Sequence, residues 1–227
     1  MTHHTPTFFD VVYTSRIFRE VETQDALSDL RNKTKPALNL LHGEHADALL
    51  VWLNRWGCRI TKKTFPTLIP KLADWWQKWE GLLPQENLCE LEDGALDVLR
   101  DAFDGLRGIP EFGPTTASKA LFAACPNAAI PWDTPIQNEF GLAGGTKEQY
   151  GEMLVKSRAE ARGLMKDAKR HKLTDIDAVI SAAGSRAKTL PELLDQYHWV
   201  IITRGHKIPT CAELAQWSQW AGCTVVR

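Results

Sequence analysis

A carboxylate in the middle of the chain combines a residue type and a position that could do chemistry. Asp133 follows Trp132 in the run IPWDTPI (130–136), directly before a helix predicted to reach about residue 140. Unpaired N–H groups at a helix start favour the ionised form of a nearby carboxylate. A fixed carboxylate can stabilise a positive charge that develops in a reaction, and can orient or deprotonate water. Alternatively, Asp133 only caps its helix, which would contribute about 1 kcal/mol.

A second group of residues, 113–119 (GPTTASK), could bind phosphate. Gly113 and the following proline are typical of a helix start, where backbone N–H groups and a partial positive charge attract anions. Gly113 lets the backbone approach a phosphate, and the hydroxyls of Thr115 and Thr116 can donate hydrogen bonds. Lys119, one turn later, is expected to contact a phosphate or to form a solvated salt bridge. A tight helix connection without a ligand is the alternative.

The elements that must position these residues are helices, because strand-like alternation is nearly absent. Apolar residues at helical spacing, with capping residues and Pro/Gly breaks, predict ten segments. Residues 7–21 form either a short helix or an extended arm. The predicted helices cover residues 23–31, 44–56, 66–80, 91–106, 114–125, 134–140, 147–170, 175–183, 190–203 and 211–220. The expected fold class is therefore all-α.

Helix, turn and helix follow one another between residues 91 and 124, and the turn reads Leu106-Arg-Gly-Ile-Pro-Glu-Phe-Gly113. This pattern resembles the helix-hairpin-helix motif, whose core is a leucine, two variable residues and hydrophobic-Pro-Gly-hydrophobic-Gly. The segment around Asp133, at its distance from Pro110, resembles the Val-Asp-Thr-His segment of the helix-hairpin-helix (HhH-GPD) DNA glycosylases. The close match covers about thirty residues. Glu111 replaces the first hairpin glycine, and Trp132 and Pro135 also depart from the family pattern.

The resemblance implies a two-lobed helical glycosylase fold. A barrel lobe would span residues 36–128 and end in the helix-hairpin-helix at about 95–125. Residues 1–35 together with 129–227 would form the second lobe, with Asp133 at the cleft.

The resemblance also implies an activity: a DNA N-glycosylase that flips a damaged or modified base out of the duplex, hydrolyses its N-glycosidic bond and leaves an abasic site. Asp133 would be the catalytic carboxylate. Thr115 stands where lyase-competent members carry a Schiff-base lysine, so the enzyme is expected to be monofunctional. Lys119 could support lyase activity only if the helix were displaced by a turn. Base excision repair and the excision of hypermodified phage bases both fit these residues.

In this family the hairpin holds DNA, so Ile109, Gly113, Thr115, Thr116 and Lys119 are the expected DNA contacts. The backbone carbonyls of Arg107, Ile109 and Phe112 would hold a structural K⁺ or Na⁺. Trp132 and Tyr13 are candidates for the base pocket. The other tryptophans at helical spacing are expected in the core, and His198 is expected to be packed or hydrogen-bonded rather than a base. These tryptophans are Trp52, Trp56, Trp75, Trp76 and Trp79.

Composition limits the other possibilities. The chain has 227 residues, 44% hydrophobic and 24% charged, which is typical of globular protein, and its net charge of −1 argues against a cationic coat. Residues 146–172 carry eight Lys/Arg against four Asp/Glu, whereas residues 80–111 carry nine acidic against two basic residues. DNA contact would therefore depend on a local patch and on helix ends.

Five scattered cysteines form no CxxC pair, so free thiols in a cytoplasmic protein are expected and the four-cysteine iron–sulfur signature is missing. We expect no other cofactor, no signal peptide, no membrane span and a monomer acting on double-stranded DNA. Two rival hypotheses remain open. One is a non-catalytic helix-hairpin-helix DNA-binding protein, and the other is a helical interaction protein with no nucleic-acid role.

Overall fold

The computed structural model describes residues 5–22, 26–210, 212–213 and 216, and in this part the chain forms α-helices and no strand. The helices are α1 (Phe8–Val21), α2 (Ala26–Lys33), α3 (Gly43–Arg55), α4 (Phe65–Trp79), α5 (Asp93–Arg107), α6 (Pro114–Ala124), α7 (Thr134–Glu139), α8 (Lys147–Arg170), α9 (Ile176–Ala182) and α10 (Leu190–His198). Two 3₁₀ turns, η1 (Lys62–Thr64) and η2 (Leu88–Glu90), and a π-helical turn, η3 (Trp199–Thr203), complete the set. The all-α prediction is confirmed. The predicted helix over 211–220 falls largely outside the described residues.

Local sequence signals explain where several helices begin. Thr7 and Asp10 form a reciprocal capping box at the start of α1, so residues 8–21 are a helix and not an extended arm. Thr146 and Gln149 form the same motif at the start of α8. Pro114 occupies the first turn of α6, where its missing N–H is not needed.

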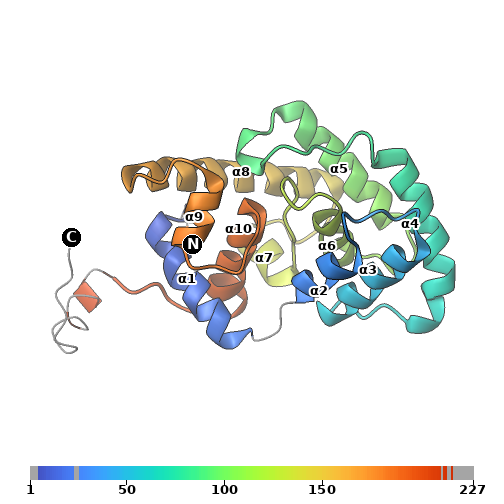
Figure 1. Ribbon diagram of the computed structural model, residues 1–227, viewed down its shortest axis with the longest axis horizontal. Helices are drawn as coiled ribbons and strands as arrows, with labels where there is room; N and C mark the ends of the chain where they lie inside the picture. The colour runs from blue at the N-terminus through green and yellow to red at the C-terminus, as the bar shows by residue number, and fades with distance from the viewer. Residues whose placement is uncertain (1–4, 23–25, 211, 214–215, 217–227) are drawn as a thin grey trace.

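The helices form two groups joined by α8 (Figure 1). Helices α2 to α6 lie on one side, and α1, α9 and α10 lie on the other. The 24-residue α8 packs against α5 in the first group and against α1, α9 and α10 in the second. Helix α2 precedes the predicted lobe boundary at residue 36, yet it packs against α3 of the first group. The pocket described below lies where the two groups meet.

Tryptophans dominate the interface between α4 and α5. Trp75 and Trp79 are buried, as predicted, and Trp75 Nε1 donates to the carbonyl oxygen of Ala102 over 2.9 Å. Gly105 allows this close approach, because a Cβ added there would lie 3.1 Å from Trp79 Nε1. Trp52 and Trp76 are buried in the same core.

The basic and acidic stretches of the sequence are partners in the structure. Arg158 of α8 pairs with Asp93 over 2.6 Å, and Lys147 lies 3.9 Å from Asp101 of α5. Arg162 donates to the carbonyl oxygen of Cys89 over 2.8 Å. Much of the basic character of α8 is therefore used inside the molecule. Within the described residues, no helix combines the length and the apolarity that crossing a membrane requires.

Candidate functional site

The turn between α5 and α6 is a compact hairpin. The N–H of Ile109 donates to the carbonyl oxygen of Leu106 over 3.0 Å, and the N–H of Phe112 donates to that of Ile109 over 3.1 Å. Gly113 caps α6 without a side-chain hydrogen bond, and a Cβ added there would meet open space. The first N–H groups of an α-helix lack partners within the helix, and the exposed Gly113 leaves open space beside this end of α6.

The backbone conformation of Glu111 explains why the motif usually has a glycine at this position. Its φ of 67° lies in the left-handed region that favours glycine. Its carboxylate accepts a 2.9 Å hydrogen bond from the N–H of Thr61, which, with a second hydrogen bond from Thr64, lowers the pKa of Glu111. The hairpin thus carries a negative charge tied to the segment before α4.

The expected DNA contacts fall into two sets. Gly113 is exposed and Thr115 is half-buried at the start of α6. Thr116 is only 5% exposed, with its hydroxyl against the thiol of Cys58, and the side chain of Ile109 is also buried. The side chains of Thr116 and Ile109 therefore cannot reach DNA as expected, because both pack inward.

The carbonyls expected to hold a monovalent cation are only partly free. The Ile109 oxygen already accepts from Phe112 N–H within the hairpin. No cluster of three or more His, Cys, Asp or Glu side chains suited to a metal occurs among the described residues. Cys58, Cys89 and Cys125 are free thiols, and the two remaining cysteines lie outside the described part.

Asp133 caps α7 and has both carboxylate oxygens engaged. Its Oδ1 accepts from the N–H of Ile136 over 3.1 Å, and its Oδ2 accepts from the hydroxyl of Thr203 over 3.4 Å. The predicted capping geometry is therefore present. Thr203 lies in η3, so the carboxylate joins the start of α7 to the end of η3.

Asp133 lies in the wall of a pocket of about 390 Å³, which is within the size range of ligand sites. Segments far apart in the sequence contribute to it. The lining residues are Phe18, Glu22, Ala26, Leu27, Arg55, Trp56, Gly57, Lys119, Pro131, Asp133, Arg186, Glu192, Asp195, Gln196 and Trp199. The pocket therefore combines aromatic walls with charged groups of both signs.

Lys119 and Trp56 form one side of this pocket. Lys119 Nζ donates to the carbonyl oxygen of Trp56 over 2.7 Å and lies 5.4 Å from the centre of its ring. Trp56, predicted in the core, is half-buried at the C-cap of α3, where it packs against the core and also lines the pocket. Lys119 lines the pocket, and its hydrogen bond to the Trp56 carbonyl holds it there.

Asp195 of α10 supplies a second carboxyl to the pocket. Burial raises its pKa to about 7, and the negative charge of Asp133 acts in the same direction, while the Lys119 ammonium opposes both. Asp133 and Asp195 thus experience different surroundings, since among the described residues Asp133 has hydrogen-bond donors and Asp195 has none.

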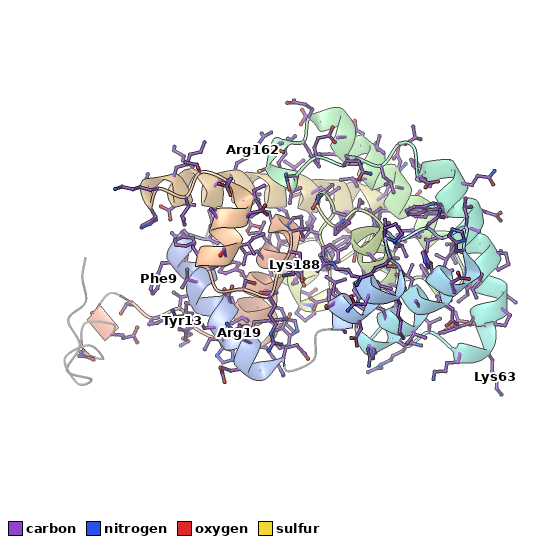
Figure 2. The ribbon with its side chains drawn as sticks, in the orientation of Figure 1. Phe9, Tyr13, Arg19, Lys63, Arg162 and Lys188 are labelled. Atoms are coloured by element: carbon purple, nitrogen blue, oxygen red, sulfur yellow. The ribbon has the colours of Figure 1, made fainter. Side chains whose placement is uncertain are left out.

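Two aromatic residues predicted to line a base pocket lie elsewhere. Trp132 is fully buried behind Asp133, where its ring lies 5.5 Å from that of Tyr150. Tyr13 lies on α1, at the end of the molecule opposite α4 (Figure 2), and does not line the pocket. The aromatic walls are instead Trp56, Phe18 and Trp199. His198 is buried, with its Nε2 3.0 Å from Glu160, in line with the expectation of a packed histidine.

The residues that sequence reasoning missed share one helical face. Asp195, Trp199 and Thr203 are spaced four residues apart, so α10 and η3 direct them to the same side. This spacing is visible in the sequence.

Compared with protein-family models, with curated proteins and with solved structures, the chain gives no match. The resemblance to helix-hairpin-helix glycosylases therefore rests on residues 106–138 alone.

Proposed function

We propose that this protein is a monofunctional DNA glycosylase, and one observation carries the proposal. Asp133, chosen from the sequence as the catalytic carboxylate, lines a pocket with aromatic walls, and that pocket also receives Lys119 from the helix after the hairpin. A base-excising enzyme needs a surface that holds the strand, a pocket for the extruded base and a fixed group that stabilises the developing charge, and we assign these roles to the hairpin, this pocket and Asp133.

In this reaction, Trp56 and Trp199 offer aromatic surfaces for the extruded base. Asp133 faces the sugar, stabilises positive charge as the C1′–N bond breaks, and takes a proton from the attacking water. The hydrogen bonds from Ile136 and Thr203 fix both oxygens of Asp133, so little reorganisation is needed as charge develops.

DNA binding follows from the exposed start of α6. The backbone around Gly113 and the half-buried Thr115 offer donors to a phosphate of one strand, which positions the duplex without reading its sequence. A monovalent cation at the hairpin carbonyls would add to this contact. The substrate is double-stranded DNA with a damaged or hypermodified base, taken up by a cytoplasmic monomer.

The absence of lyase activity follows from two residues. Thr115 offers a hydroxyl where a Schiff-base amine would stand, and Lys119 Nζ is hydrogen-bonded to the Trp56 carbonyl. Hydrolysis by water is therefore the expected outcome, without strand nicking.

The test uses duplexes that contain uracil, hypoxanthine, 3-methyladenine, 8-oxoguanine, or hydroxymethylcytosine with and without glucose. Wild type and the Asp133→Asn variant are compared, with Asp47→Asn as the control because Asp47 is an exposed carboxylate on α3. Asn retains the ability to cap α7, so the variant should fold normally and lose only the charge.

The expected result is abasic sites from at least one duplex, nicked only after alkali, with a loss of at least about 100-fold in Asp133→Asn. Nicking without alkali, or a borohydride-trapped adduct, would overturn the monofunctional assignment. Bound DNA without product would favour the alternative of a non-catalytic DNA-binding protein, in which Asp133 only caps α7.

A further inference from the structure

Three acidic side chains line the pocket near α10, and two of them have structural partners. Asp133 accepts hydrogen bonds from Ile136 and Thr203. Glu192 accepts from Arg31 Nη2 over 2.8 Å and from the N–H of Lys188 over 2.8 Å. These contacts hold both carboxylates in place.

Asp195 is different. Its carboxyl is partly buried in the pocket wall, and no described residue forms a hydrogen bond or a salt bridge with it. Burying a carboxyl without such a partner costs free energy. A group that the fold does not use, directed into the pocket that holds Asp133, points to a role in that pocket.

Burial favours the protonated form of Asp195 near neutral pH, and the surrounding charges act in both directions. Burial raises its pKa to about 7, and Asp133 and Glu192 also raise it. Lys119 and His198 act in the opposite direction. The remaining charged side chains of the pocket are Glu22, Arg55 and Arg186. Asp195 can therefore hold a proton near neutral pH, as a general acid must.

We propose that Asp195 is the general acid of this site and donates its proton to the departing base, while Asp133 acts on the sugar and the water. The inference rests on the proposed glycosylase function and deepens it.

The step balances as follows. The C1′–N bond breaks and its electron pair leaves with the base, as the Asp195 proton moves to a ring nitrogen or carbonyl oxygen of that base. The base departs neutral, and Asp195 becomes a carboxylate. Water adds its oxygen to C1′ and gives its proton to Asp133, and exchange with solvent then restores both carboxyls.

The proposal also defines a class of substrate. An acid helps a neutral base, which would otherwise leave as an anion. A base that already carries a positive charge through N-alkylation leaves neutral without a proton donor. The preferred substrates are therefore neutral bases, oxidised, deaminated or hypermodified, rather than cationic alkylated ones.

The test measures single-turnover excision from pH 5.5 to 8.5. The substrate is the duplex with a neutral modified base that wild type excises fastest. Wild type should slow as the pH rises through about 7, because Asp195 loses its proton. Asp195→Asn should be about 100-fold slower at pH 6, with a rate that no longer falls above pH 7 and with unchanged affinity for the duplex. Asp47→Asn should behave as wild type.

Two further outcomes separate this proposal from the one it rests on. If Asp133→Asn is inactive while Asp195→Asn stays within threefold of wild type, or keeps the alkaline fall in rate, the acid role is overturned and the glycosylase assignment stands. If wild type excises no base from any duplex, both the glycosylase assignment and the acid role of Asp195 are overturned. Asp195→Glu, which keeps an acid on a longer side chain, should recover part of the lost rate; recovery by Asp195→Gln instead would overturn the acid role.

Discussion

Lys119 Nζ donates a 2.7 Å hydrogen bond to the Trp56 carbonyl oxygen, and so connects α6 to the end of α3 across one side of the pocket. The same ammonium lowers the pKa of Asp195, against the larger effect of burial. Lys119, which the sequence predicts to contact a phosphate, therefore affects the protonation of Asp195 inside the pocket.

Replacing Lys119 with methionine should raise the pKa of Asp195 further above its usual range, because burial and Asp133 would then be opposed by His198 alone among the groups that act on it. We expect a shift of about one unit upward from the wild-type value, measured by ¹³C NMR titration of the Asp195 carboxyl. Lys119→Arg keeps the positive charge and should titrate close to wild type. An unchanged titration in Lys119→Met would contradict the assigned interaction.

Asp195→Asn should change stability in a pH-dependent way. Burial keeps a proton on folded Asp195 up to about pH 7, whereas the unfolded chain releases it near pH 4, so Asp195 lowers wild-type stability progressively as pH rises between these values. The variant should therefore gain about 1–3 kcal/mol relative to wild type at pH 8, and much less at pH 4. Urea unfolding at both pH values measures this, with Asp47→Asn as the control. An equal gain at both would argue against the raised pKa.

Glu111→Gly should strengthen binding to undamaged DNA. The change removes a carboxylate beside the exposed start of α6 and suits the left-handed φ of 67°. We expect dissociation constants about three- to tenfold lower at low salt, measured by fluorescence anisotropy, with the difference shrinking as salt increases. Glu111→Gln separates the two effects, since it removes the charge and keeps the strained backbone. Weaker binding by both variants would show that the hydrogen bond between Glu111 and Thr61 matters more for DNA binding than the negative charge of Glu111.

Gly145→Ala should disturb the start of α6. An added Cβ would collide with the ring of Pro114, and the φ of Gly145 is +62°. Gly184→Ala is a matched control, because Gly184 has a φ of +64° and open space around the added atom. We expect Gly145→Ala to lose about 1–3 kcal/mol more in urea unfolding than the control, and to bind DNA more weakly. Equal losses would mean that the loop moves away without disturbing the hairpin.

The helices could be predicted from the sequence because their caps and breaks are local. The face of α10 that meets the pocket could not. Glu192, Gln196 and His198 are buried along with the leucines of this helix, so no polar face contrasts with an apolar one. Only the packing of α10 against α1 and α8 decides that Asp195 and Trp199 border the pocket.

Trp56 shows a second limit of pattern reasoning. It continues the stripe of Trp52 at a spacing of four, which predicts a core residue. It lies at the C-cap, however, where the backbone leaves the helical path, so its ring is half-buried beside the pocket. The capping position of Asp133 could be predicted, because helix capping and the run IPWDTPI are both properties of the local sequence.

The long helix α8 has a consequence for how the molecule melts. It spans about 36 Å and packs against α5 on one side of the pocket and against α1, α9 and α10 on the other. Neither group of helices can lose its structure without exposing a face of α8. Heating should therefore give one calorimetric transition, and a ligand in the pocket should slow amide hydrogen exchange in both groups together.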